Sequence, residues 1–413
     1  MKSTIFATAL MMLACAAGPK AQDKVRITVI PPENGTITVS PQLPPDCMVE
    51  RGTKLTIRAA ANKGYMLDGI YATVDQPYKY YNECCAPESL LVADKAMEVG
   101  VSFLPQKTFS KIRITNNVAY ARPGNKTLKY DVFAPKKAKN LPCVIIVHGG
   151  GWSSNTEDIM RGMGRELAMT GKFVVFSIDY RFIRNGDGSG VPVEMYQIIE
   201  DVYGAIAHIM EHAALYGGDA TRLFVTGDSA GGHLSAAAIN FANFIGDGGY
   251  GSSYGIYEFK PTYIPKGKTT AQIRNEICQS LLGAVPTYPV LTENALMRFY
   301  NSDFEKIRHI TPICFIPKVM ERRVPQLIIR GTQDGLITDA DMQNYCKAMT
   351  DAGQEVKYLQ VGGIGHAFFD WRHDARSQET FDRYARPQIK IMVDFFEDIL
   401  SRKSDFPGKI TNL

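Results

Sequence analysis

The most informative stretch of the sequence reads Arg222-Leu223-Phe224-Val225-Thr226-Gly227-Asp228-Ser229-Ala230-Gly231-Gly232-His233-Leu234. Its first half contains a short apolar run typical of a buried strand, and the small residues at 230–238 suit a tightly packed helix. Between them, residues 227–231 fit G-x-S-x-G, a sharp turn that holds a serine in strained geometry with its hydroxyl exposed. Ser229 is therefore predicted to be a nucleophile, with an ordinary glycine turn as the alternative.

Strand-like and helical patterns alternate on both sides of this turn. Apolar runs typical of strands occupy residues 143–147, 173–178, 223–226, 281–285, 326–330 and 356–361, after an antiparallel lead-in at residues 112–114, 118–120 and 128–133. Helical patterns lie between them, and a last one covers residues 388–400. The alternation predicts an α/β fold, a mostly parallel sheet covered by helices, with ligands bound at the carboxyl ends of the strands.

A serine nucleophile needs a base to take its proton and a carboxylate to orient that base. His366 is the best candidate base because it follows a predicted strand through a glycine-rich loop. Asp334 is the best candidate carboxylate because it follows another predicted strand through a short turn. Asp339 and Asp341 are alternatives, although they open the next predicted helix, where carboxylates suit the N-terminus. We predict a triad of Ser229, Asp334 and His366, in the chain order of α/β-hydrolases.

Acyl transfer also needs N–H donors for the oxyanion of the tetrahedral intermediate. A glycine loop directly follows the strand at residues 143–147 and reads His148-Gly149-Gly150-Gly151-Trp152. Consecutive glycines leave backbone amides unobstructed, so we expect the donors to be Gly150, Gly151 and Ala230. His148 is expected to fix this loop. Trp152 is expected to lie beside the acyl-binding site as an apolar wall or a sugar platform, with simple packing as the alternative.

One pattern indicates different chemistry. The run His208-Ile209-Met210-Glu211-His212 matches H-x-x-E-H, which occurs in zinc peptidases. The two histidines would share one helix face, but no third ligand is identifiable, and the segment also fits an ordinary amphipathic helix. We therefore expect no metal site and no cofactor.

The first 21 residues have the features of a secretory signal peptide. The basic Lys2 precedes an apolar stretch at residues 5–17, which is too short for a membrane span. Cleavage near Ala21 would export the protein to the periplasm or the extracellular space. Lipid anchoring through Cys15 is a less favoured alternative. No later segment is long and apolar enough to be predicted to cross a bilayer.

Residues 22–105 are predicted to form a small all-β module ahead of a catalytic domain at residues 106–413. Apolar residues alternate there with period two, as in Val25, Ile27 and Val29, and Asn34-Gly35 predicts a hairpin turn. Segments 34–39, 52–57 and 64–65 resemble the divergent internalin-type repeat of bacterial surface and secreted proteins. The resemblance implies a module that binds a glycan or the cell surface, or acts as a spacer. A purely structural appendage is the alternative.

The composition excludes some classes of partner. Apolar residues make up 45% and charged residues 21% of the chain, as in soluble globular proteins. A net charge of +4 is too small and too dispersed to indicate binding to nucleic acid or to a membrane surface. An oxidising compartment would permit a disulfide from Cys47 to Cys84 or Cys85, although buried thiols are the simpler expectation.

Residues 244–268 depart from the alternation of strands and helices, and they are rich in glycine and tyrosine. A long irregular insert in a compact domain is usually functional or mobile, so we expect a lid or a pocket wall, with a surface loop as the alternative. Trp152 and the polar run Arg372-His373-Asp374 are expected to complete the pocket. Aromatic faces with polar edges suit sugar rings or a phenolic acyl group better than a fatty chain.

Several motifs together resemble those of the hormone-sensitive-lipase-like esterases, in the branch that contains bacterial acetyl-xylan and feruloyl esterases. They lie at residues 148–152, 216–219, 227–233, 331–334 and 365–366. The resemblance covers about residues 107–400 and implies an α/β-hydrolase fold and a carboxylester hydrolase with the predicted triad. The insert at 244–268 and the long segment at 372–386 depart from the family pattern, so substrate identity does not follow from it.

The sequence thus predicts an exported serine esterase that removes acetyl or hydroxycinnamoyl groups from plant polysaccharides. The substrate would be a small-molecule or polysaccharide ester. A serine peptidase of the same fold and a general short-chain esterase are enzymatic alternatives. A hydrolase-like binding protein without activity is the alternative from another class.

Overall fold

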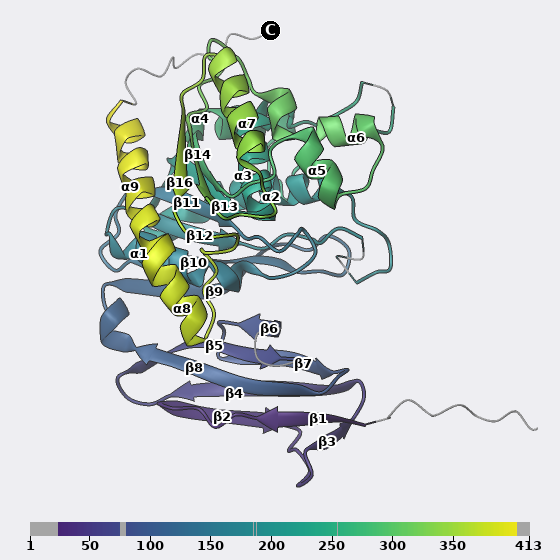
Figure 1. Cartoon of the computed structure of the whole chain (residues 1–413), viewed down its shortest axis with the longest axis vertical. Coiled ribbons are helices and arrows are strands. Elements are labelled where there is room, and N and C mark those ends of the chain that lie inside the picture. The colour runs from purple at the N-terminus through teal and green to yellow at the C-terminus, as the bar shows by residue number, and fades with distance from the viewer. Residues whose placement is uncertain (1–23, 75–79, 185, 187, 254, 403–413) are drawn as a thin grey trace, which may run out of the picture.

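The computed structural model describes residues 24–74, 80–184, 186, 188–253 and 255–402. The predicted signal peptide and Cys15 lie outside these residues. Figure 1 shows an all-β region formed by the N-terminal part of the chain, next to a larger part in which helices surround a sheet. None of the helices in the described ranges has the length and apolar character needed to cross a membrane.

The larger part contains the predicted mostly parallel sheet, in the strand order β16-β15-β14-β13-β11-β12-β10-β9. The strands are β9 (Ile112–Ala121), β10 (Leu128–Pro135), β11 (Leu141–Val147), β12 (Val174–Ile178), β13 (Gly218–Asp228), β14 (Leu281–Thr287), β15 (Gln326–Gly331) and β16 (Val356–Val361). Strand β10 is antiparallel to β9 and β12, and the pairs from β12 to β16 are parallel. The α/β fold class is therefore confirmed, with the two runs at 112–114 and 118–120 joined in the single strand β9.

Helices cover both faces of this sheet. Successive side chains of β11 point to opposite faces of the sheet. Val144 and Ile146 belong to the apolar core on one face, and Ile145 and Val147 belong to the core on the other. The first core is completed by α1 (Arg161–Met169) and α9 (Arg386–Ser401), which lie together in Figure 1. The second is completed by α2 (Met195–His212), α3 (Ala230–Asn240), α4 (Thr270–Ser280) and α7 (Asp339–Asp351).

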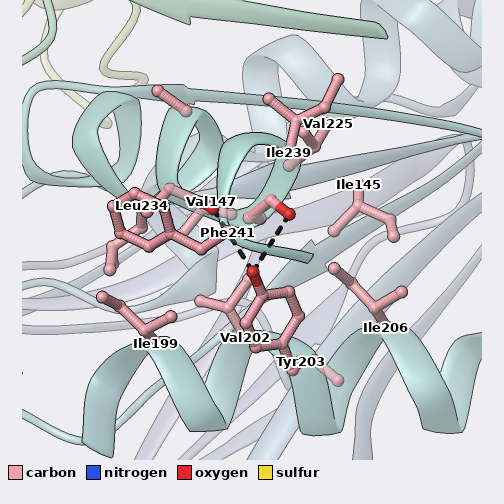
Figure 2. Close-up of a cluster of buried hydrophobic side chains, with 14 of the residues drawn as sticks. Ile145, Val147, Ile199, Val202, Tyr203, Ile206, Val225, Leu234, Ile239 and Phe241 are labelled. Carbon is pink, nitrogen blue, oxygen red and sulfur yellow. Dashed lines mark hydrogen bonds between the residues drawn. The ribbon is translucent and has the colours of Figure 1, made fainter. Parts of the chain in front are cut away.

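The helix after the predicted nucleophile is buried along its whole length. Figure 2 shows apolar side chains of α2 directed toward α3 and the sheet, with Tyr203 among them. The Tyr203 hydroxyl lies 3.3 Å from the carbonyl oxygen of Ala237 and 3.2 Å from that of Ala238. A buried hydroxyl needs a hydrogen-bond partner, so these contacts tie α2 to the C-terminal half of α3.

The N-terminal region has a sheet in the order β3-β1-β8-β5-β6 and a second in the order β2-β4-β7. Its strands are β1 (Lys24–Val29), β2 (Gly35–Ser40), β3 (Met48–Glu50), β4 (Thr53–Ala61), β5 (Tyr65–Thr73), β6 (Tyr80–Cys84), β7 (Glu88–Ala93) and β8 (Met97–Pro105). Ile27, Leu55 and Val99 belong to its own apolar core.

The predicted hairpin at Asn34-Gly35 is wrong. Strands β1 and β2 lie in different sheets, since β1 pairs with β3 and β8 while β2 pairs with β4. Asn34 does adopt the left-handed conformation expected of a turn, with φ 65°, but the turn carries the chain from one sheet to the other. All seven described cysteines are free thiols, including Cys47, Cys84 and Cys85.

Candidate active site

Ser229 lies in a strained turn between β13 and α3, with φ 53° and ψ −113°. The flanking glycines allow this turn because there is no room for side chains beside it. A Cβ atom on Gly231 would lie 1.9 Å from the carbonyl oxygen of Val147, and one on Gly227 would lie 2.5 Å from that of Gly231. Local sequence thus dictates the turn, and the turn presents the hydroxyl at the carboxyl end of the sheet.

The structure brings the three predicted triad residues together in one hydrogen-bonded chain. His366 Nε2 lies 2.8 Å from Ser229 Oγ, and His366 Nδ1 lies 2.8 Å from Asp334 Oδ2. All three follow strand ends, as the α/β pattern requires. The geometry lets the imidazole take the hydroxyl proton on one side while the carboxylate fixes its tautomer on the other.

The carboxylate of Asp334 is held by more than the histidine. Its Oδ1 accepts hydrogen bonds from the backbone amides of Leu336 at 2.8 Å and Ile337 at 3.0 Å. Burial acts to raise the pKa of Asp334, but the hydrogen bond and charge of His366 and the two amides outweigh it, so the pKa lies below its usual value. Asp334 therefore stays ionised at neutral pH, beside an imidazole that gains charge during the reaction.

The glycine loop after β11 is held in place by Asp228. The amide of Gly149 donates to Asp228 Oδ1 at 2.6 Å, so this amide is used within the protein. Gly150 and Gly151 adopt positive φ angles of 117° and 60°, and both line the same cavity as Ser229 and Ala230. Because α3 begins at Ala230, the first amide of this helix has no intrahelical acceptor. The predicted oxyanion donors are thus gathered around the serine.

His148 lies at the start of this loop and is fully buried. Its Nδ1 lies 2.7 Å from the carbonyl oxygen of Gly149, its Nε2 lies 3.4 Å from Asp179 Oδ1, and its carbonyl oxygen accepts from the Tyr180 hydroxyl at 2.8 Å. These contacts fit the expected role of holding the loop.

Three residues near the serine were not singled out from the sequence: Asp228, Tyr288 and Asp370. The Tyr288 ring lies 4.6 Å from the His366 ring, and its hydroxyl lies 3.5 Å from Asp228 Oδ2. Burial and the nearby charge of Asp370 raise the pKa of Asp228 well above its usual range. The sequence contained a signal for two of these residues. Asp228 is the variable residue of G-x-S-x-G, and Tyr288 directly follows the strand β14.

The cavity at the serine has a volume of about 370 Å³, within the usual range for small-molecule sites. Val290, Phe299, Leu336 and Ile337 contribute apolar side chains, and Asn155 and Asp370 contribute polar ones. Trp152 also lines it, but this side chain is only 2% exposed and its indole N–H donates to His233 Nδ1 at 3.2 Å. Packing is therefore its main role, and a broad sugar platform is not what the structure shows.

The insert at residues 244–268 does not line this cavity in the part of it that the structure describes. It lies against α2 and α6 (Phe304–His309) instead. The ring of Tyr250 stacks on Tyr196 at 4.7 Å, and the ring of Tyr257 stacks on His309 at 3.3 Å. The expectation of a pocket wall is therefore corrected, because aromatic stacking holds the insert on a neighbouring surface.

The polar run at residues 372–374 also lies outside the lining of the catalytic cavity. Arg372 pairs with Glu83 of β6 at 3.1 Å, and the His373 ring stacks on Tyr71 of β5 at 3.4 Å. Asp374 accepts from the amide of Ser377 and so begins α8 (Ala375–Thr380). Arg372 and His373 thus contact the N-terminal β region, and none of the three residues lines the catalytic cavity.

The H-x-x-E-H residues take part in local contacts within and around α2. His208 Nδ1 lies 3.0 Å from the Tyr130 hydroxyl, and His212 Nδ1 lies 2.9 Å from the carbonyl oxygen of His208. Glu211 accepts a hydrogen bond from the hydroxyl of Tyr263. Each of these groups contributes to packing of the helix, as an ordinary amphipathic helix would.

The triad geometry predicts how activity depends on pH. Only the neutral imidazole of His366 can accept the Ser229 proton, so kcat/KM should rise with pH and then reach a plateau. Asp334 should cause no further change in kcat/KM over this range, because its pKa is lowered and its carboxylate is already ionised. Initial rates with p-nitrophenyl acetate from about pH 5 to 9 should show this rise and plateau. A fall in rate on raising the pH through this range would contradict the assignment of His366 as base.

Comparisons with known proteins show which family and fold the chain resembles. The BD-FAE family profile matches residues 130–348, a region that contains Ser229 and Asp334. The carboxylesterase NlhH of Mycobacterium tuberculosis is 37% identical over 113 residues, which make up 27% of this chain and 33% of that protein. The carboxylic ester hydrolase LipN of the same organism is 26% identical over 251 residues, 58% of this chain and 60% of that one. The chain thus spans only a third to three fifths of the length of these two relatives.

A solved structure shares the fold. The apo form of Thermogutta terrifontis esterase 2 is similar with a TM-score of 0.50 and 21% sequence identity. The match covers 70% of this chain and 96% of that one. At this identity the similarity shows a common α/β-hydrolase fold.

Proposed function

The chain belongs to the BD-FAE family of α/β-hydrolase esterases, and we propose that it is a serine carboxylester hydrolase that acts through an acyl-enzyme. One observation carries this proposal: the hydrogen-bonded chain from Ser229 through His366 to Asp334, in a cavity that also contains the loop glycines. The named carboxylesterase relatives support the same reaction class.

The geometry supports two half-reactions. In the first, Ser229 Oγ attacks the ester carbonyl while His366 Nε2 takes its proton, and the amides of Gly150, Gly151 and Ala230 stabilise the oxyanion. The tetrahedral intermediate collapses, the C–O bond to the alcohol breaks, and His366 returns the proton to the leaving alcohol. In the second, water attacks the acyl-serine with His366 as base, which releases the acid and regenerates the free hydroxyl.

A burst experiment tests this mechanism. With p-nitrophenyl acetate, rapid mixing should release p-nitrophenol in a first phase, equal to the enzyme concentration, if deacylation is slower than acylation. Mass spectrometry of acid-quenched protein should find one acetyl group on Ser229. An enzyme that hydrolyses the ester without any acyl group on Ser229 would contradict the proposal.

For the substrate, we propose short or aromatic acyl groups carried on a carbohydrate, such as acetyl or hydroxycinnamoyl esters of plant polysaccharides. The cavity supports this acyl class, because its volume is about 370 Å³ and Phe299 adds an aromatic residue to its apolar lining. The family resemblance supports the carbohydrate, although fold and family alone do not establish a substrate.

Acyl-chain dependence should separate an esterase of this kind from a lipase. Each additional CH₂ group buried in a long apolar groove contributes about 0.8 kcal/mol, roughly fourfold in kcat/KM. We expect kcat/KM to stop rising after p-nitrophenyl butyrate, and xylan to release acetate or ferulate. A steady rise to the decanoate, with no acid released from xylan, would make the enzyme a lipase.

We also propose that the protein is exported, on the evidence of residues 1–21 alone. Expression of the full chain in a bacterial host, followed by fractionation, should place the protein outside the cytoplasm. Sequencing of its mature N-terminus would distinguish cleavage near Ala21 from lipid attachment at Cys15.

A further inference from the structure

The N-terminal β region is fixed to the catalytic part by a buried charged network. Asp68 of β5 is 1% exposed, and it accepts hydrogen bonds from Arg165 at 2.7 Å and from Arg161 Nε at 3.2 Å. The indole N–H of Trp371 donates to the same carboxylate at 3.2 Å. Burial acts to raise the pKa of Asp68, but the two guanidinium groups hold it well below its usual range. Because a buried charge is costly without its partners, this network holds the two parts in one orientation.

A second set of contacts connects β6 to the oxyanion loop. Glu83 accepts hydrogen bonds from Arg161 Nη2 at 2.7 Å and from Arg372 Nη1 at 3.1 Å. Arg372 Nη2 lies 3.4 Å from Asn155 Oδ1, and Asn155 Nδ2 lies 3.5 Å from the carbonyl oxygen of Gly149. A chain of polar contacts therefore runs from the β region to the loop that carries the predicted oxyanion donors.

Glu83, Asn155 and Arg372 line a second cavity of about 320 Å³ between the two parts. The β region contributes Asn82 and Glu83, and the catalytic part contributes Ser153, Asn155 and Arg372 among others. Asn155 lines both this cavity and the one that contains the nucleophile. The two cavities therefore share Asn155 as a wall residue.

The lining chemistry favours a neutral ligand with many hydroxyl groups. Amide, hydroxyl, carboxylate and guanidinium groups offer both donors and acceptors, as a hydroxyl-rich ligand requires. An anion is disfavoured because the charge of Arg372 is already matched by Glu83 at 3.1 Å and Asp370 at 3.4 Å. A fatty chain is disfavoured because it would take these polar groups out of water without replacing their hydrogen bonds. Phe182 also lines this cavity, and Lys126 Nζ lies 3.9 Å from the centroid of its ring.

We propose that this second cavity binds the saccharide that carries the acyl group, at a sugar unit next to the acylated one, and that Asn82 of the β region contacts that unit. The inference rests on the proposed esterase function, because it assigns a place to the leaving alcohol. It also gives the N-terminal β region a role as one wall of the substrate cleft.

Variants at Asn82 test the proposal against matched variants at Asn62, an exposed asparagine in a loop of the same β region. The measured quantity is kcat/KM for O-acetylated xylotriose divided by kcat/KM for p-nitrophenyl acetate, which has no sugar. Asn82→Ala should lower this ratio about fivefold through loss of one hydrogen bond to the saccharide, besides the bond that Asn82 Nδ2 donates to Ser89 Oγ at 3.3 Å. Asn82→Trp should lower it more than about tenfold by filling the cavity. Asn62→Ala and Asn62→Trp should leave the ratio unchanged.

A binding measurement keeps this proposal separate from the esterase proposal. Calorimetry with xylotriose and the Ser229→Ala protein should detect binding that the added Asn82→Trp change weakens at least about tenfold. A wild-type protein that hydrolyses neither ester would refute the esterase function, while the calorimetry would still test the cavity. Asn82 variants that match the Asn62 variants in both hydrolysis and binding, with unchanged melting temperatures, would overturn the cavity assignment. So would a wild-type enzyme that cleaves p-nitrophenyl acetate but neither binds nor deacetylates the saccharide.

Discussion

Replacing Ser229 by alanine is expected to lower kcat for p-nitrophenyl acetate by a factor of about 10⁴–10⁶. The loss is this large because the triad acts as a unit, and without Oγ no acyl-enzyme can form. The small residual rate should come from the oxyanion donors and from substrate binding. The KM of any residual activity and the circular dichroism spectrum should stay close to those of the wild type.

Ser235→Ala provides the matched control for this variant. Ser235 lies in the same buried helix, and its hydroxyl donates only to the carbonyl oxygen of Gly232, within that helix. Its removal should leave kcat within about twofold of the wild type, since a local helix hydrogen bond contributes little. Near-wild-type hydrolysis by Ser229→Ala would refute the nucleophile, and an equal loss in both variants would show that the helix had been disturbed instead.

The catalytic geometry could be predicted from sequence because each part of it depends on local features. The elbow follows from the glycines around Ser229, and the positions of Asp334 and His366 follow from the strands that precede them. In a parallel sheet the carboxyl ends of strands meet at one edge. Residues 137 positions apart, such as Ser229 and His366, therefore come within hydrogen-bond distance without any long-range pattern in the sequence.

The surroundings of the site could not be predicted in the same way. Asp68 and Arg161 are 93 positions apart, and neither lies in a motif. Their pairing depends on how sheets from different parts of the chain dock, for which a single sequence gives no periodic signal. The same holds for the insert at 244–268. Its composition indicated an aromatic surface, but its stacking partners Tyr196 and His309 belong to α2 and α6.

The second large effect is expected for Asp334→Asn, which should lower kcat about 10⁴-fold at neutral pH. The structure gives a specific reason. The amides of Leu336 and Ile337 both donate to Oδ1, so the carbonyl oxygen of an asparagine would occupy that position. Its NH₂ group would then face His366 Nδ1 as a donor, where the aspartate accepts. The imidazole would carry its proton on Nε2, and it could no longer take the proton of Ser229.

Asp339→Asn is the control that separates this effect from a general loss of charge nearby. Asp339 Oδ1 accepts hydrogen bonds from the Tyr358 hydroxyl at 2.6 Å and from Gln360 at 2.9 Å, and Asp339 does not line the catalytic cavity. It should keep near-wild-type kcat. Histidine ¹⁵N NMR provides a second measurement, because the dominant neutral tautomer of His366 should change from Nδ1–H in the wild type to Nε2–H in Asp334→Asn. Retained activity in Asp334→Asn with an unchanged tautomer, or loss of activity in Asp339→Asn, would show that another carboxylate orients the base.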